Sequence, residues 1–253
     1  MRYRVFCLSP FWILLAGSPA SRPQAQDLPS HVVINADYPK SAVFRVSLFG
    51  TDAVRTEGKV PAGYSPRRQR FNGSIDVWFD GMDGDFRIYR SKGALKMRET
   101  AGGRTQIKPV QAGGRIEFDR LGYPKKSPSD PADLIPTFPS KPVAAGDHWT
   151  AKALVTEPLG TGEAVYTYTV EAISLAENGH ILATIRFNIA ANIVPPPALK
   201  GWVSTLTGHG RLDWDTEWNQ RDAGSYHIAY SAAHENSGIF ETREMTEHVV
   251  KIK

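Results

Sequence analysis

The sequence is poor in cysteine, in long apolar runs and in catalytic motifs. Cys7 is its only cysteine, and no stretch after residue 25 approaches the roughly 20 apolar residues of a membrane-spanning helix. It contains no Gly-x-Ser-x-Gly elbow, no Walker loop and no His-Glu-x-x-His pair. These absences predict a mature chain with no disulfide, no transmembrane segment and no metal-ligating cysteine, and they give no enzyme signature and no cofactor.

Residues 1–25 predict a secretory signal peptide. Arg2 and Arg4 precede an apolar run of roughly 13 residues, too short to span a bilayer, and small residues then allow cleavage after Ala20 or Ala25. Cleavage after Ala25 leaves 27 basic against 26 acidic residues, a net charge of +1 rather than +4, which excludes the footprint of a nucleic-acid-binding protein. An exported chain without disulfides fits a secreted or periplasmic place in the bacterial cell envelope.

Apolar and polar residues alternate with a period of two along most of the mature chain. Such alternation is typical of half-buried strands, and the connections between the runs are short, which favours antiparallel neighbours. The predicted fold is therefore all-β: a single large antiparallel meander sheet curled into a barrel or half-barrel. At most one or two short helices are expected, at 129–135 and, more weakly, at 198–206.

Glycine-rich and polar clusters divide the predicted strands. We interpret six of them as turns: 80–85, 90–93, 101–103, 112–114, 177–179 and 221–224. On a larger scale, an extended segment at 26–42 precedes one β domain at 43–253. A proline-rich connection at 122–147 separates its N-terminal sheet region (43–118) from its C-terminal one (149–252).

One segment resembles a family. Residues 141–149 read Lys-Pro-Val-Ala-Ala-Gly-Asp-His-Trp, and a glycine-led strand follows at 208–215. This combination resembles uncharacterised secreted bacterial β-proteins that carry a Lys-Pro-Val-x-x-Gly-Asp-x-Trp segment. The resemblance implies a curved antiparallel sheet in the cell envelope and no particular reaction.

Three carboxylates, Asp213, Asp215 and Glu217, form the best candidate catalytic constellation. On one strand they share a face, so two of them could act as acid and nucleophile in a glycoside hydrolase. The strict alternation of these acids with apolar residues such as Trp214 and Trp218 also fits a strand whose acidic face is exposed to solvent and whose tryptophan face is buried. The second interpretation is favoured, so no catalytic residue is assigned.

Two further charged clusters have simple structural interpretations. The acids at 80, 83 and 85 lack the spacing of an EF-hand and fit a hairpin turn, so no metal site is predicted. The arginines at 67, 68 and 70 fit a solvated loop before a strand at Ile75.

Aromatic residues give the main indication of function. Trp78 lies opposite Val77, and Phe49 lies opposite Leu48, so two strands are apolar on both faces. Such a strand is sandwiched between layers or lines an apolar cavity. Trp78, Phe49, Tyr166 and Tyr168 are therefore the candidate ligand-binding residues.

These patterns favour a non-enzymatic envelope protein that binds an apolar or lipid-like ligand, or an envelope protein, on a curved sheet. The architecture is similar to lipoprotein-carrier half-barrels, although clear lid helices are missing. A hydrolase of envelope or extracellular polysaccharide, using Asp213 and Asp215, and a purely structural envelope protein remain the alternatives.

Overall fold

The computed structural model describes residues 28–125, 137–157 and 160–253. The predicted signal peptide and the predicted helix at 129–135 lie outside these residues. The described strands are β1 (Val43–Glu57), β2 (Arg67–Asp83), β3 (Phe86–Ala101), β4 (Arg104–Phe118), β5 (His148–Glu157), β6 (Gly160–Leu175), β7 (Ile181–Ile193), β8 (Val203–Asp215), β9 (Gln220–His234) and β10 (Ser237–Lys251). No helix in the described ranges is both long and apolar enough to cross a bilayer.

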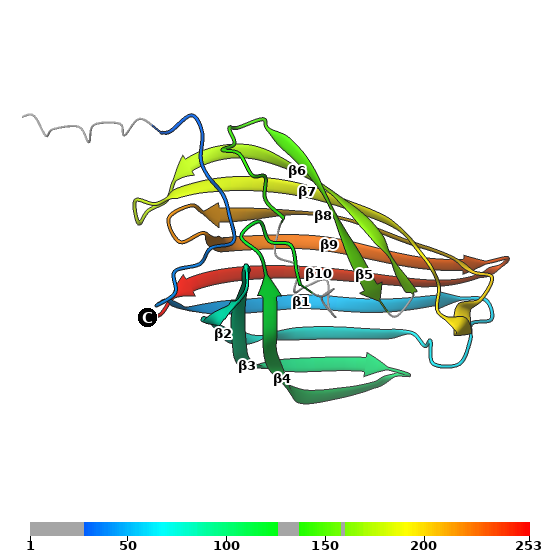
Figure 1. Cartoon of the computed structure of the whole chain (residues 1–253). Coiled ribbons are helices and arrows are strands. Elements are labelled where there is room, and N and C mark those ends of the chain that lie inside the picture. The colour runs from blue at the N-terminus through cyan, green and yellow to red at the C-terminus, as the bar shows by residue number, and fades with distance from the viewer. Residues whose placement is uncertain (1–27, 126–136, 158–159) are drawn as a thin grey trace, which may run out of the picture.

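All ten strands belong to one antiparallel sheet, which confirms the predicted fold class. Their order is β4-β3-β2-β1-β10-β9-β8-β7-β6-β5, so two meanders meet where the first and last strands pair. The edge strands β4 and β5 are not paired with each other, and the sheet is a curled, open one rather than a closed barrel (Figure 1). Pro109 lies on edge strand β4, where a missing N–H does not interrupt an internal ladder.

Several predicted turns lie inside strands, and this corrects the sequence interpretation. Residues 90–93 belong to β3, 112–114 to β4 and 221–224 to β9. Of the predicted turn at 80–85, residues 80–83 belong to the end of β2, and 84–85 form the hairpin turn to β3. Residues 101–103 and 177–179 contain the turns expected there. Glycine inside a strand also marks a bend or a close approach of two backbones, so glycine content alone does not identify a turn.

The weaker helix candidate at 198–206 is also corrected. Only Pro197–Leu199 forms a 3-10 helix, and β8 starts at Val203. Three consecutive prolines at 195–197 fix the backbone before this turn, and from Ser204 onward buried and exposed residues alternate as in a strand.

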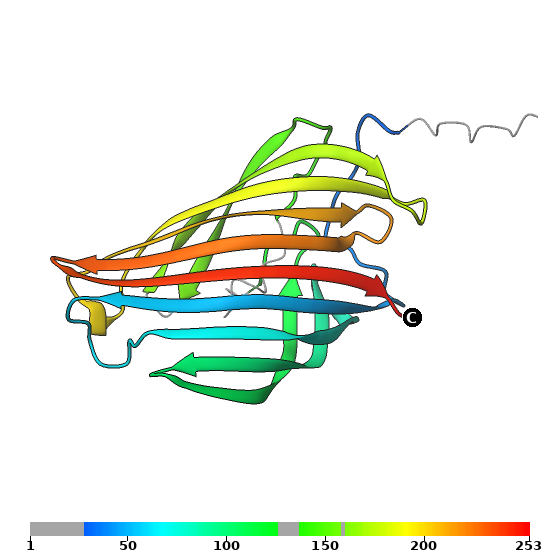
Figure 2. The same cartoon turned by 180° about the vertical axis from the view of Figure 1, so that it is seen from behind.

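Glycines allow the N-terminal strands to bend and to pack closely. β3 and β4 change direction part-way along their length (Figures 1 and 2). At Gly93, in the middle of β3, a Cβ atom would lie 2.1 Å from the carbonyl oxygen of Ser74 on β2. At Gly50 on β1 it would lie 2.3 Å from the ring of Phe71, which covers this glycine. Close approach therefore requires glycine at both positions.

Two segments of the chain fill part of the sheet's inner face. Val32 and Val143 exchange backbone hydrogen bonds of 2.8 Å, and the Phe138 N–H donates to the carbonyl of Leu121 at 2.8 Å. Their side chains pack with inward residues of β5 to β9, including Trp214, whose ring centroid is 4.4 Å from that of Phe138. We call the segments 32–38 and 137–143 the plug. The plug is hydrogen-bonded to itself and to residues 120–121, which follow β4. It lies against the C-terminal half of the sheet's inner face.

Replacing Gly93 with valine tests the close approach in β3. The added Cβ collides with backbone rather than with a flexible side chain, so we expect the Gly93→Val protein to lose about 1–3 kcal/mol of unfolding free energy. Urea denaturation followed by tryptophan fluorescence measures this loss. Gly114→Ala is the control, because a Cβ at Gly114 meets nothing within 4 Å. Equal effects of the two substitutions would contradict the account.

Candidate functional site

The N-terminal half of the inner face forms a floor of side chains in register across five strands. Two rows of this floor are predominantly apolar: Val249, Val46, Ile75, Gly93 and Ala112 form one, and Glu247, Leu48, Gly73, Leu95 and Val110 the next. A third row, ending in Lys108, runs through Met245, Gly50, Phe71 and Met97. At about 3.3 Å per residue, the floor from Val77 to Phe71 is about 20 Å long.

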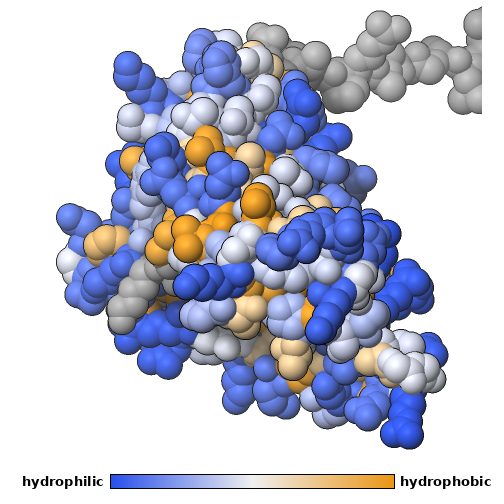
Figure 3. Space-filling model, turned by 90° about the vertical axis from the view of Figure 1, so that its right-hand side faces the viewer, coloured by the Kyte–Doolittle hydropathy of each residue, from blue (hydrophilic) through white to orange (hydrophobic). Residues whose placement is uncertain are grey.

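Two adjoining cavities lie over this floor. The first has a volume of about 160 Å³ and the second about 470 Å³, and both are partly open to solvent. They share Leu48, Ile75, Ile116 and Met245 in their walls, so we treat them as one trough. In the side view of Figure 3, apolar surface is visible in the middle of the molecule with hydrophilic side chains around it. The larger cavity falls in the volume range of small-molecule sites, about 300–1,000 Å³.

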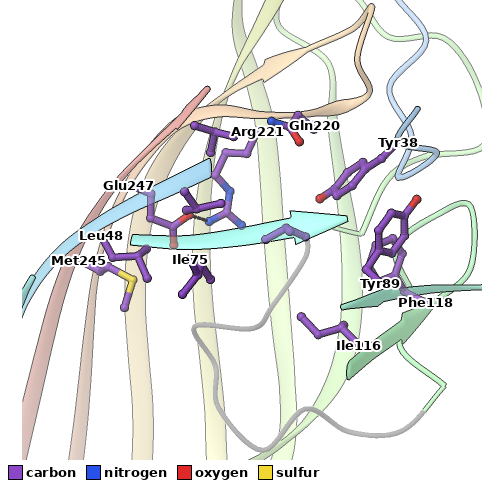
Figure 4. A pocket seen from close by; sticks show the side chains of 13 residues that line it. Tyr38, Leu48, Ile75, Tyr89, Ile116, Phe118, Gln220, Arg221, Met245 and Glu247 are labelled. Carbon is purple, nitrogen blue, oxygen red and sulfur yellow. Dashed lines mark hydrogen bonds and ion pairs between the residues drawn. The ribbon is translucent and has the colours of Figure 1, made fainter. Parts of the chain in front are cut away.

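Aromatic rings close one end of the trough. Tyr89 stacks on Phe118 with centroids 4.9 Å apart, and Tyr38 lies 4.8 Å from Tyr89 (Figure 4). Asp37 accepts a 2.7 Å hydrogen bond from Arg87 Nε on β3, which fixes the segment carrying Tyr38; this contact lowers the pKa of Asp37. Burial raises the pKa of Tyr38 to about 12, so the phenol is neutral at physiological pH.

A buried ion pair forms one wall of the first cavity. Arg221 on β9 donates to the carboxylate of Glu247 on β10, beside Met245 and Leu48 (Figure 4). Burial alone would lower the pKa of Arg221, but Glu247 and the other groups around it raise it above its ordinary value. Because burying an unpaired charge costs several kcal/mol, the pair keeps this wall polar without a net charge.

A second charged cluster lies at the other end of the trough, and we call it the polar end. Asp52 and Arg243 face each other across β1 and β10 and both line the larger cavity. Arg67 on β2 places a nitrogen 3.9 Å from Asp52 Oδ2 and 4.0 Å from Glu241 Oε1, and Arg243 lies 3.4 Å from the same Glu241 oxygen. Burial, followed by the neighbouring Asp52 carboxylate, raises the pKa of Glu241.

The four residues predicted to bind ligand do not come together. Phe49 and Trp78 alternate with Leu48 and Val77, which line the trough, so they project from the outer face; Phe49 is 58% exposed. Tyr166 and Tyr168 are buried in the core on β6, with their rings 6.0 Å apart. On β1 and β2, the predicted residues therefore face outward, and the residues that precede them in the chain, Leu48 and Val77, line the cavity.

The three candidate carboxylates also have separate surroundings. Asp213 faces outward on β8 and accepts a 2.6 Å hydrogen bond from Thr184 Oγ1. Asp215 is buried, 2.7 Å from His180 Nδ1, and accepts the backbone N–H groups of Glu217 and Trp218 at 2.9 Å each. β8 ends at Asp215, so Glu217 lies exposed in the following turn. Asp215 is accordingly engaged in shaping that turn.

The other two charged clusters are accounted for by strand contacts. Asp80 pairs with Arg90 at 2.6 Å across β2 and β3, and Asp83 pairs with Lys125. In the described part of the chain, no group of three or more potential metal ligands comes together. The predicted loop at Arg67 is instead the start of β2, because Arg67, Gln69 and Phe71 alternate inward.

Comparisons with known proteins give no family. No family model matches the chain, and no curated protein matches it. Among solved structures, an outer membrane channel from Pseudomonas putida F1 is 6% identical with a TM-score of 0.31, covering 85% of this chain and 97% of the channel. The translocator domain of autotransporter NalP from Neisseria meningitidis is 9% identical with a TM-score of 0.29, covering 84% and 90%. At such TM-scores the likeness carries no argument about function.

The environment of Glu241 makes the stability of the protein depend on pH. The pKa of Glu241 in the folded state is raised above 4.5, so folding favours its protonated form. The contribution of this carboxyl group to the unfolding free energy is therefore complete below pH 4.5 and is lost as pH rises through the folded pKa. We expect the unfolding free energy of Glu241→Gln, relative to wild type, to increase between pH 4 and pH 8. Urea titrations at several pH values measure it, and Glu244→Gln on the exposed face of the same strand controls for loss of a negative charge. A relative stability that falls with pH would contradict this assignment.

Proposed function

We propose that the chain is a non-enzymatic β-protein of the bacterial cell envelope that binds a lipid-like molecule in the trough. The observation that carries the proposal is the uneven filling of the inner face. The plug covers the C-terminal half, whereas apolar side chains of β1 to β4 and β10 line cavities that are partly open to water. Apolar surface left uncovered in a soluble protein commonly marks a binding site.

The shape of the trough favours a chain-like ligand over a compact one. Its floor is about 20 Å long by strand geometry, and its apolar middle lies between the aromatic end and the polar end. The smaller cavity alone compares with an apolar cavity of about 150 Å³ that takes up a benzene-sized molecule. An amphiphile with one apolar chain matches this sequence of surfaces.

Secretion and the envelope location remain part of this proposal. They are supported by the leader-like residues 1–25 and by the near-neutral balance of charges beyond them. The polysaccharide hydrolase receives no such support, because Asp213 hydrogen-bonds on the outer face while Asp215 is engaged with a turn and a histidine.

Binding of the neutral fluorescent probe N-phenyl-1-naphthylamine tests the proposal. We expect its emission to rise on addition of the protein, because the trough offers an apolar environment. Ile75 lines both cavities, so Ile75→Trp fills them, and we expect it to weaken probe binding at least about tenfold.

Phe49→Trp is the matched control, since it adds a tryptophan to the outer face of the neighbouring strand. We expect it to bind the probe as wild type does. Absence of binding to wild type, or equal loss in both variants, would mean that the trough is not a binding site.

A further inference from the structure

Four exposed cations gather on the outer face of the sheet, behind the trough. We call them the basic patch: Arg68 and Arg70 on β2, and Lys96 and Arg98 on β3. The residues between them in each strand line the larger cavity, so these four project from the opposite face. Arg70 and Arg98 are directly opposite each other, and the other two cations are their diagonal neighbours. Cβ atoms in such positions lie about 4.5–5.5 Å and about 7–8 Å apart.

The basic patch has no carboxylate to neutralise it. In the ranges that the structure describes, none of its four cations forms an ion pair or a side-chain hydrogen bond. Like charges directly opposite each other destabilise a sheet, so the pairing of Arg70 with Arg98 weakens the fold. Such a cost is offset when an anion from outside the protein binds both cations.

A second cross-strand arginine pair on the same face shows the alternative arrangement. Arg186 on β7 is directly opposite Arg211 on β8. Their Nε atoms lie 2.9 Å and 3.9 Å from the two carboxylate oxygens of Glu171, which balances part of their charge. The sheet therefore neutralises one arginine pair internally and leaves the other to the surroundings.

Exposed apolar side chains border the basic patch on both sides. Phe49 on β1 lies in the same row as Lys96, and Ile107 on β4 is directly opposite Arg98. The two apolar residues are 58% and 59% exposed. With a spacing of about 4.8 Å between strands, the four strands carry this surface over about 14 Å. Cations and apolar side chains thus share one surface.

Charge is also separated along the chain. The stretch from β2 to β4, Arg67–Phe118, has eleven basic and six acidic residues, a net charge of +5. The remainder of the chain after residue 25 has 16 basic and 20 acidic residues, a net charge of −4. Such a separation orients a protein on a negatively charged surface, with the β2–β4 region toward that surface.

From these observations we infer that the basic patch docks the protein on an anionic lipid bilayer, with Phe49 and Ile107 in the headgroup region. Lysine and arginine near a membrane surface are attracted to anionic headgroups. Apolar side chains beside them gain from leaving water only where an apolar layer is available, which favours a bilayer over a soluble polyanion. The inference goes beyond the proposed function and does not depend on it, because the patch and the trough lie on opposite faces.

Sedimentation with lipid vesicles tests the inference. We expect the protein to bind vesicles of about 30% phosphatidylglycerol in phosphatidylcholine at least about tenfold more tightly than pure phosphatidylcholine vesicles. The preference should disappear at about 1 M salt, where the screening length falls to about 3 Å. Contacts common to both kinds of vesicle, including uptake of lipid by the trough, cancel in this comparison. Equal binding to both would overturn the inference and leave the proposed function standing.

A double variant locates the binding surface. Arg70→Gln with Arg98→Gln should weaken binding to the anionic vesicles at least about tenfold, because each cation near such a surface strengthens binding about fivefold. Arg186→Gln with Arg211→Gln is the matched control, since it removes the same charge from the same face, and we expect a change below about twofold. An equal loss in both double variants would show that net charge alone attracts the protein, and the patch would not be its docking surface.

The apolar border separates a membrane from a soluble polyanion. Phe49→Ser with Ile107→Ser should weaken binding to the anionic vesicles at least about threefold and leave binding to dextran sulfate unchanged. Vesicle binding that is unaffected by these substitutions would contradict entry of the two side chains into the headgroup region. Tighter binding of the wild-type protein to dextran sulfate than to vesicles of equal anion concentration would replace the membrane with a polyanionic partner.

Discussion

The inner face of a curled sheet must be covered by something, and the plug, among the residues that the structure describes, covers only half of it. Every inward apolar side chain left in water forgoes about 25 cal/mol per Å² of the burial that stabilises the fold. On β5 to β9 the plug supplies the cover, through paired backbone at Val32 and Val143 and through Phe138 against Trp214. On the other half, the corresponding positions line the trough. The location of the proposed site follows from this difference.

Buried charges line one wall of the trough and one of its ends. The Arg221–Glu247 pair stands in the wall of the first cavity, and the polar end limits the second. Burying charge in opposite pairs costs less than burying it singly, but hydrophobic side chains of similar volume would often do as well or better. Retaining polar groups at such positions is therefore informative. It supports a site that must orient a ligand as well as hide its apolar part.

The alternation of side chains was sufficient to predict the class of fold, but not the lengths of the strands. Glycines such as Gly93 resemble turn residues in the sequence, whereas in the structure they permit close approach inside a continuous strand. The start of β2 was interpreted as a loop because arginines cluster at 67, 68 and 70, whereas in the structure Arg67 lies beside the carboxylates of Asp52 and Glu241. Both errors arise from tertiary contacts, since a neighbouring strand or a distant carboxylate decides what a residue does at that position.

The candidate site shows the same division between local and long-range information. Leu48 and Val77 were recognised as one face of apolar strands, yet the aromatic residues opposite them were chosen as ligand contacts. Which face is covered depends on the plug, whose segments lie far from β1 and β2 in sequence. Glu241 lies in a mixed polar run, so only the pairing of β1 with β10 reveals its carboxylate neighbour.

Reactivity of single cysteines on the inner face tests most directly whether half of the sheet is uncovered. In a chain with Cys7→Ser, cysteines at Leu48 in the trough and at Ile185 beneath the plug are labelled with a small maleimide, and their rates are compared under native conditions. The account predicts that the cysteine at position 48 reacts at least about a hundredfold faster, since position 185 must await local unfolding. Equal protection at both positions would contradict an open trough.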